Sequence, residues 1–253
     1  MNGDVVRSLI PEQVTPGKRL GRHIVHDPRS RDFPAEGAPA ITSVIHNATG
    51  LPLNQGDIGS CTANALCGAL NSAPDFKGGA PRTETDAITV YELETKLEGD
   101  PYPANDPGGS GLEVCKAGVQ LGWISSYQHA FGLDSALLAL VLRPVITGIG
   151  WYTSFDTPSG SGLVVIAPGA TVRGGHEVVA DQIDAPNQLV WFWNSWGSDL
   201  RRRRSLLHVV RHVAAAPRAE RGRDRSDSLA PADLSPPGLW ITGEIAWRPE
   251  RRR

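Results

Sequence analysis

Three short stretches of this 253-residue sequence contain residue types that can do chemistry together. The first places Gln55 six residues before Cys61. The second contains His176 after two glycines, and the third contains Asn194 in an Asn-Ser-Trp-Gly run. Each stretch alone is more often structural, because cysteines and histidines are common inside proteins. In this order along one chain, they favour a nucleophilic site.

The chemistry that these residues predict is acyl transfer through a cysteine thiolate. Cys61 stands at the predicted start of a helix, where unpaired N–H groups and the helix dipole stabilise S⁻. His176 is the predicted base. The side-chain oxygen of Asn194 can orient the imidazole, and Trp196 can shield that hydrogen bond from water. The side-chain amide of Gln55 and the backbone N–H of the cysteine are predicted to bind the oxyanion.

These stretches resemble the motifs of the papain-like (C1) cysteine peptidases, and of their bacterial and phage members in particular. The nucleophile, histidine and asparagine motifs of that family look like Gly59-Ser60-Cys61, Gly174-Gly175-His176 and Asn194-Ser195-Trp196-Gly197. The intervals of 115 residues from the cysteine to the histidine and 133 to the asparagine are also similar. The resemblance covers about residues 31–197.

The resemblance implies a fold class and a set of substrate contacts. It implies an α+β fold with a helical lobe over about 31–143, an antiparallel β-barrel lobe over about 144–197, and the active site in the cleft between them. The substrate-binding residues that it implies are Gly108, Gly109, Gly175 and Trp196. The two adjacent glycines look like the strip that pairs with the substrate backbone.

Three departures from the family pattern are visible. Ile58 stands where the family has a cysteine, so the disulfide of that position is absent, and Thr62 replaces an aromatic residue. Only about 30 residues precede Arg31, which resembles the start of a mature peptidase, so we expect no large inhibitory prodomain.

Hydrophobic patterns and turn residues predict helices in the first part and strands in the second, as in α+β proteins. Residues 1–30 are predicted to be an irregular extension. The predicted helices span 61–70, 86–97, 112–121 and 134 to before Pro144, and the predicted strands span 145–152, 162–167, 176–183 and 189–193.

The segment 198–253 is rich in Arg, Pro and Ala and does not continue the family pattern. Residues 201–253 hold 13 Arg against 6 Asp and Glu, a balance of +7; the total of −2 leaves −9 for the first 200 residues. No alternating pattern precedes Leu239–Trp247. Three interpretations stay open: a solvated basic tail, a tail that binds nucleic acid or another anionic surface, and a shifted reading frame near residue 198. Translation of the other two frames tests the last one.

Composition narrows the remaining function classes. A net charge of −2 gives no global attraction to nucleic acid or to anionic membranes. Three cysteines give no disulfide framework, and no signal peptide or membrane span is visible, so we expect a cytoplasmic protein. We expect a peptide or protein substrate, no nucleic-acid partner, no cofactor or metal, and a monomer.

Two functions fit these observations best. The first is a cysteine-type endopeptidase that works through an acyl-enzyme intermediate. The alternative is a catalytically impaired papain-like homologue that acts as a binding or interaction module, since an altered C-terminal segment leaves strand edges uncovered. A cell-wall amidase fits less well, because such a site needs neither Gln55 nor the Asn-Ser-Trp run. A basic DNA-binding protein fits least.

Overall fold

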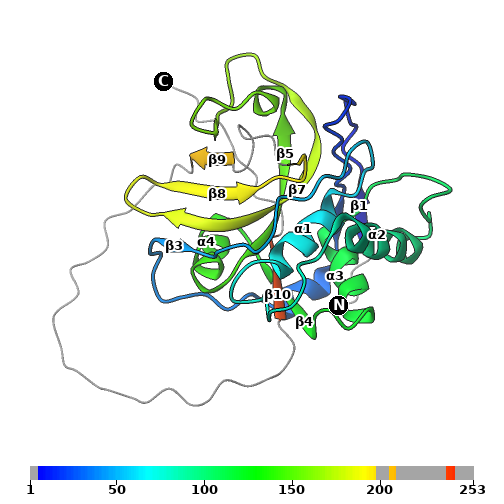
Figure 1. The fold of residues 1–253 in the computed structure, drawn as a ribbon, viewed down its shortest axis with the longest axis horizontal. Coiled ribbons are helices and arrows are strands. Elements are labelled where there is room, and N and C mark those ends of the chain that lie inside the picture. The colour runs from blue at the N-terminus through cyan, green and yellow to red at the C-terminus, as the bar shows by residue number, and fades with distance from the viewer. Residues whose placement is uncertain (1–4, 198–204, 209–237, 243–253) are drawn as a thin grey trace.

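The computed structural model describes residues 5–197, 205–208 and 238–242, and it combines helices with one large sheet (Figure 1). The helices are α1 (Cys61–Leu70), α2 (Glu84–Glu98), α3 (Gly111–Gln120), α4 (Leu133–Leu142) and the 3-10 helices η1 (Pro28–Asp32) and η2 (Thr153–Asp156). The strands are β1 (Val6–Ser8), β2 (Ile24–His26), β3 (Val44–Ile45), β4 (Ser126–Ala130), β5 (Val145–Tyr152), β6 (Leu163–Val164), β7 (Val172–Asp184), β8 (Leu189–Trp193), β9 (Ser205–His208) and β10 (Gly238–Thr242).

The helices begin and end where local sequence signals favour it. Thr83 and Asp86 form a capping box at the start of α2, and Gly99 ends the helix with a φ of 86°. Ser110 caps α3 by accepting a hydrogen bond from the backbone of Glu113. The predicted helix over 61–70 coincides with α1, and the other predicted helices match α2, α3 and α4 to within two residues at each end.

The large sheet has the strand order β4-β10-β5-β7-β8-β9-β6, and β3 pairs with β7 off this path. Its centre is antiparallel: β7 pairs with β5 on one side and with β8 on the other. The predicted strands 145–152 and 189–193 coincide with β5 and β8, whereas β7 begins four residues before the predicted 176. His176 and Asn194 therefore belong to neighbouring strands or their ends.

The antiparallel β-barrel predicted for about 144–197 does not appear as a closed barrel among the residues that the structure describes. β10 pairs in parallel with both β4 and β5, and β6 pairs in parallel with β9, so the sheet is mixed. The two ends of its path, β4 and β6, do not pair with each other among the described residues. The strand β10, which the sequence pattern left undefined, is what separates β4 from β5.

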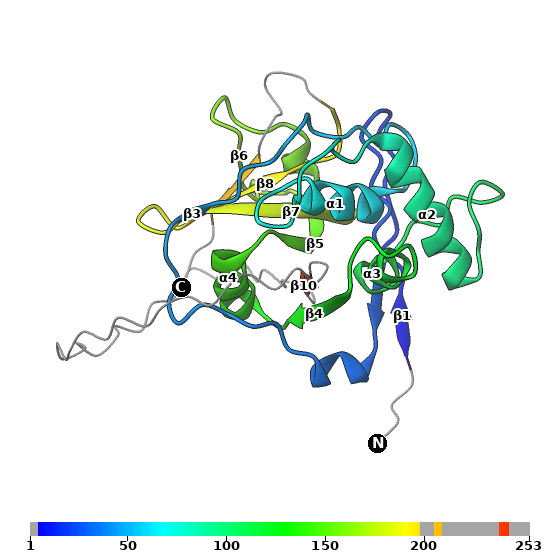
Figure 2. The same ribbon diagram turned by 60° about the horizontal axis from the view of Figure 1, so that its bottom comes forward.

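The core lies between the helices and this sheet (Figure 2). α1 packs against β7, and Gly68 of the helix allows this approach because a Cβ there would lie 3.2 Å from the Val179 side chain. Buried residues of α1, α2 and α3 form one cluster with Val179 and Ile146 of the sheet. This packing fixes the start of α1 against the strand that carries His176.

The predicted irregular extension over 1–30 contains ordered structure. β1 pairs with β2 in antiparallel register, and η1 follows. The backbone N–H of Gln13 donates to the carbonyl of Arg173 at 2.7 Å, and Leu20 is fully buried. These contacts join positions far apart in sequence, so no local pattern announces them. The division of the chain into domains stays a prediction.

The segment 198–253 falls largely outside the described residues. Only 205–208 and 238–242 are described there, as β9 and β10, so the three interpretations of this segment stay predictions. Among the described residues, no helix combines the length and the apolarity that crossing a membrane requires.

Candidate active site

Cys61 is the first residue of α1, and its side chain is 0% exposed. The predicted cap, Ser60, precedes the helix, but its side chain makes no capping hydrogen bond. Asn64 instead donates to the carbonyl of Ser60 at 2.8 Å. The side chain of Ser60 therefore leaves the first N–H groups of the helix uncapped, and the positive end of the helix dipole lies at the cysteine.

His176 and Asn194 are brought together as the sequence predicts. The imidazole Nε2 lies 2.8 Å from the side-chain oxygen of Asn194, and that oxygen also accepts from the backbone N–H of Ser195 at 2.7 Å. Because a carbonyl oxygen only accepts, Nε2 carries the hydrogen of the neutral ring and Nδ1 is the basic nitrogen. Nδ1 has no hydrogen-bond partner among the described residues. It is the nitrogen that can take a proton.

Trp196 lies over the histidine, as expected for a residue that shields the His–Asn hydrogen bond. Its ring stacks on His176 at a centroid distance of 5.2 Å and an interplanar angle of 26°. Trp151 meets the same imidazole edge-on, with centroids 4.9 Å apart. Aromatic rings on two sides exclude water from the hydrogen bond and hold the imidazole in one orientation.

Gln55 is buried and joined to the asparagine stretch. Its backbone N–H donates to the carbonyl of Ser195 at 2.8 Å, and the Ser195 hydroxyl donates to its side-chain oxygen. The side-chain amide donates to the carbonyl of Ile58 at 2.8 Å and to that of Leu20 at 3.2 Å. The amide predicted to bind an oxyanion thus binds a carbonyl oxygen of the chain itself.

Residues 20–23, which we call the cover segment, run between the predicted substrate-binding glycines. The backbone N–H of Arg22 donates to the carbonyl of Gly175 at 3.1 Å. On the other side, the backbone N–H of Gly109 donates to the carbonyl of Gly21 at 2.8 Å, and the carbonyl of Gly109 accepts from the N–H of His23 at 2.9 Å. The bridge between Arg22 and Gly109 is parallel. The cover segment therefore forms a peptide strand on the predicted peptide-binding groups.

Three glycines, which we call the peptide track, make room for this strand. A Cβ on Gly108 would lie 1.8 Å from the carbonyl oxygen of Gly21, and one on Gly175 would lie 2.2 Å from that of Arg22. A Cβ on Gly109 would meet the Glu94 carboxylate at 2.0 Å. No side chain fits at Gly108 or Gly175 while a backbone lies on the track, and none fits at Gly109 beside the Glu94 carboxylate.

Two carboxylates beside the track were not predicted as site residues. Glu94 of α2 accepts from the backbone N–H of Ser110 and from the Thr62 hydroxyl, each at 2.8 Å. Glu177 of β7 lies 2.7 Å from the Nε of Arg22. The single sequence signal for Glu177 was its place directly after the histidine. Arg22 carried no signal, because it lies in the segment predicted to be irregular.

Burial dominates the ionisation of the candidate residues. It raises the pKa of the Cys61 thiol, which the Glu177 carboxylate raises further, whereas a hydrogen bond from the Glu177 backbone lowers it. Burial also lowers the pKa of His176 to about 4, although the hydrogen bond with Asn194 acts in the opposite direction. With the cover segment in place, the thiol and the imidazole are therefore both neutral at pH 7.

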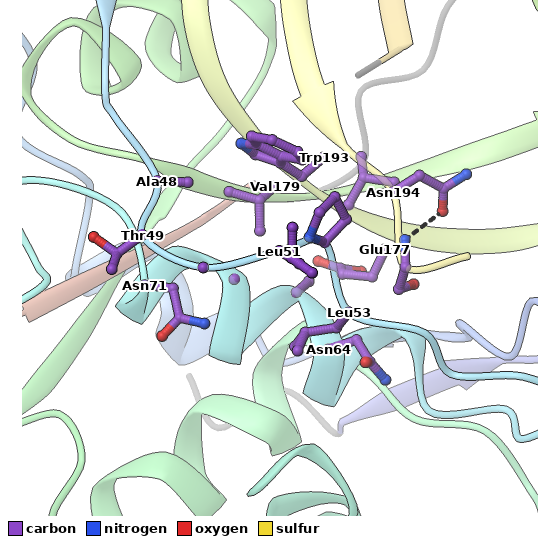
Figure 3. Close-up of a pocket in the computed structure, with 16 residues that line it drawn as sticks. Ala48, Thr49, Leu51, Leu53, Asn64, Asn71, Glu177, Val179, Trp193 and Asn194 are labelled. Carbon is purple, nitrogen blue, oxygen red and sulfur yellow. Dashed lines mark hydrogen bonds between the residues drawn. The ribbon is translucent and has the colours of Figure 1, made fainter. Parts of the chain in front are cut away.

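A pocket adjoins the site (Figure 3). It lies between the loop 48–53, α1 and the strands β7 and β8, and Glu177, Asn194 and Ser195 contribute to its wall. The dashed line in Figure 3 marks the hydrogen bond that holds the Asn194 side-chain oxygen on the backbone of Ser195. The pocket thus reaches the residues that orient the histidine. Among the described residues, no group of three His, Cys, Asp or Glu side chains has the arrangement of a metal site.

Comparisons with known proteins support the fold. No known protein family matches the sequence, and no curated protein matches it either. Among solved structures, xylellain, a cysteine protease from Xylella fastidiosa, is similar with a TM-score of 0.58 and 20% sequence identity. The similarity covers 79% of this chain and 92% of xylellain. The mixed helix-and-sheet fold of this chain thus resembles that of a bacterial cysteine protease.

Proposed function

We propose that this protein is a cysteine-type endopeptidase of the papain-like (C1) kind, in which Cys61, His176 and Asn194 form the catalytic site. The observation that carries the proposal is the buried hydrogen bond of 2.8 Å between His176 and Asn194 beneath Trp196. It fixes the imidazole on the strand against which α1 packs, next to the start of that helix. The likeness to a bacterial cysteine protease supports the same proposal. In this proposal, the helices α1–α3 form one lobe of the papain-like fold and the large sheet forms the other.

In the proposed reaction, each of these groups has a separate task. His176 Nδ1 takes the thiol proton, and the Cys61 sulfur attacks the carbonyl carbon of the scissile peptide bond. The oxyanion of the tetrahedral intermediate is held by the Gln55 side-chain amide and the cysteine N–H. The imidazolium then gives its proton to the leaving amine as the C–N bond breaks, which leaves an acyl-enzyme. Water, deprotonated by the same imidazole, hydrolyses the thioester and restores the thiol.

Asn194 acts by orienting the imidazole. Its oxygen keeps hydrogen on Nε2, so that Nδ1 faces the chemistry as an acceptor. Trp196 keeps water away from this hydrogen bond. Neither residue touches the reacting atoms, so both are positioning residues.

The test is peptide cleavage by the full chain together with alkylation of Cys61. We expect the wild type to cleave a quenched fluorescent peptide library, and Cys61→Ala to lose at least about 10³-fold of that rate. Once the cover segment is displaced, chloroacetamide at pH 5.5 should label Cys61 more slowly when His176→Ala is added, because the imidazole no longer stabilises the thiolate. Cleavage that survives in Cys61→Ala would refute the proposal.

The second candidate is a papain-like binding scaffold without turnover. The observation that favours it is that Cys61 and His176 are both 0% exposed. A folded, protease-resistant chain that cleaves no library peptide, even after the cover segment is displaced, would favour this candidate over the peptidase.

A further inference from the structure

Arg22 is the residue of the cover segment that carries a buried charge. Its exposed fraction is 7%, and its Nε lies 2.7 Å from Oε2 of Glu177, whose side chain is fully buried. The two side chains form a buried ion pair. The guanidinium thus lies against the residue that follows His176.

The sheet leaves space for this guanidinium. Gly148 of β5 is the cross-strand partner of Glu177. A Cβ on Gly148 would lie 1.9 Å from the Nε of Arg22, so any other residue at this position would displace the guanidinium. Gly148 and Glu177 therefore lie opposite each other on adjacent strands, and together they leave a space that fits a planar guanidinium.

Glu177 depends on this cation. Apart from Arg22, no described residue donates a hydrogen bond to either of its oxygens. Burial raises the pKa of Glu177, and the nearby Arg22 acts against that rise. A buried carboxylate that loses its partner cation destabilises the fold. Glu177 therefore needs a positive charge beside it whenever a peptide on the track excludes water.

A second carboxylate extends the same preference along the cover segment. Glu98 lies 2.8 Å from the imidazole of His23 and 3.3 Å from the guanidinium of Arg7. Glu94 lies under Gly109, and burial raises its pKa well above the usual range, with the carboxylates of Glu98 and Glu177 acting in the same direction. Carboxyl groups therefore lie along the peptide track, and the cover segment places Arg22 against Glu177 and His23 against Glu98.

We propose that Glu177 is a specificity residue of the site and selects a peptide with an arginine side chain at the position that Arg22 fills. Arg22 is then the chain's own occupant of that position, and a substrate must displace the cover segment to bind. The proposal names the substrate class of the peptidase proposed above and rests on it for cleavage. Binding of the peptide does not require cleavage, so the two can be tested separately.

The first experiment opens the site without changing Arg22 or Glu177. Gly21 has a φ of +126°, and a Cβ there would lie 2.3 Å from the carbonyl oxygen of Gly59, so Gly21→Ala should displace the cover segment in the full chain. The matched control is Gly17→Ala, since Gly17 has a φ of +67° and a Cβ there meets nothing within 4 Å. Labelling by iodoacetamide is followed at each cysteine by mass mapping.

We expect Cys61 to be labelled at least tenfold faster in Gly21→Ala than in the wild type or in Gly17→Ala. Cys67 and Cys115 are buried elsewhere and report unfolding, so their labelling should stay slow. If Cys61 is labelled at the wild-type rate in a folded Gly21→Ala chain, the cover segment does not close the site and the proposal fails.

The second experiment measures selectivity on the opened chain. The probe is a capped hexapeptide with the sequence of residues 19–24, and its comparison peptides carry Gln or Glu in place of the arginine at position 22. We expect the arginine peptide to protect Cys61 in Gly21→Ala at a concentration at least tenfold lower than the Gln peptide, and the Glu peptide not to protect. Adding Glu177→Gln should reduce the preference to less than twofold. Equal protection by the first two peptides, no protection by either, or a preference that survives Glu177→Gln would overturn the proposal.

A further variant keeps the proposal testable if Gly21→Ala fails to fold, which equal labelling of all three cysteines would reveal. Arg22→Gln in the full chain should speed labelling of Cys61 at least fivefold, while Arg22→Lys, which keeps the charge, should stay within twofold of the wild type. Labelling of Arg22→Gln at the wild-type rate would overturn the proposal. Peptide protection without any cleavage would sink only the peptidase, whereas cleavage without preference for arginine would sink only the role of Glu177.

Discussion

Two buried carboxylates lie beside the same peptide track, and they are held in different ways. Glu94, on the helical side, is bound by Thr62 and by the backbone of Ser110, both within the helical part of the molecule. Glu177, on the sheet side, is paired with Arg22 of the cover segment. The contacts of Glu94 therefore come from the helical part itself, whereas in our proposal a substrate can replace the contact of Glu177 with Arg22. Such a site would combine a fixed carboxylate with one that selects the bound peptide.

The largest expected effect is the loss of stability when Glu94, the carboxylate on the helical side, is removed. Glu94→Ala leaves the Ser110 N–H and the Thr62 hydroxyl without an acceptor in a buried place, and we expect the free energy of unfolding to fall by about 4 kcal/mol. Glu177→Ala is the matched change on the sheet side. It leaves the Arg22 guanidinium without its carboxylate, but the cover segment can carry that charge into water, so we expect a loss of about 1 kcal/mol instead of the roughly 3–5 kcal/mol of a fixed buried pair. Urea unfolding measures both, and equal losses would contradict the comparison.

The second effect concerns pH. The pKa of His176 is lowered to about 4, so the folded state favours the neutral ring, and this stability is lost as pH falls from about 6.5 towards 4. The full loss is about 3 kcal/mol. In Gly21→Ala the ring regains contact with water, so its pKa should rise and the loss should shrink.

Titration of the imidazole ring protons by NMR between pH 8 and 5 provides the measurement. His129 serves as an internal control, because burial lowers its pKa to about 4 as well and it lies away from the peptide track on β4. We expect neither histidine to titrate above pH 5 in the wild type, and only His176 to do so in the variant. Parallel behaviour of the two rings would show that the cover segment does not control the burial of His176.

A smaller effect is expected on the sheet side when Trp196, which stacks on His176, is changed. Trp196→Ala removes the ring that stacks on His176, so we expect kcat to fall about tenfold, which is about 1.4 kcal/mol. Trp196→Phe keeps a stacking ring and loses the N–H that donates to the carbonyl of Arg19, so kcat should stay within about twofold. Initial rates on one fluorescent peptide test both variants. Equal losses would mean that the indole N–H, and not the stacked ring, matters.

The smallest effect on stability is expected from a partly exposed charge pair on the helical side. Lys116 and Glu113 form an i,i+3 pair on α3 with a distance of 2.7 Å, and the lysine is partly exposed. Lys116→Ala should change the free energy of unfolding by only about 0.3 kcal/mol, because water and salt screen such pairs. A fall of more than about 1 kcal/mol in the free energy of unfolding, measured with urea, would contradict the expectation that exposed charge pairs stabilise this side less than buried ones.

Much of the site could be predicted because its signals are local. The helix start at Cys61 follows from the turn residues before it and the apolar spacing after it, and the bounds of β5 and β8 follow from their β-branched and aromatic residues. The hydrogen bond between His176 and Asn194 could be anticipated because one residue type needs an acceptor and the other offers one. These predictions needed no knowledge of distant partners.

The remainder depends on contacts between distant parts of the chain. β4 has few β-branched residues, and it pairs in parallel with β10, which lies more than 100 residues later in the chain. Arg22 looked like one of several scattered charges until its partner Glu177 was placed beside it. The roles of all predicted site residues, and the place of Glu177 among them, await the measurements described above.

The pairing of Arg22 with Glu177 also has a consequence for the order in which the molecule forms. The two residues lie 155 positions apart (177 minus 22), so their contact closes a very long loop. Contacts of high sequence separation require the most chain entropy and form slowly. The local pairing of α1 with its neighbouring helices can precede them. During folding, we therefore expect the helix that carries the thiol to form before Arg22 reaches Glu177.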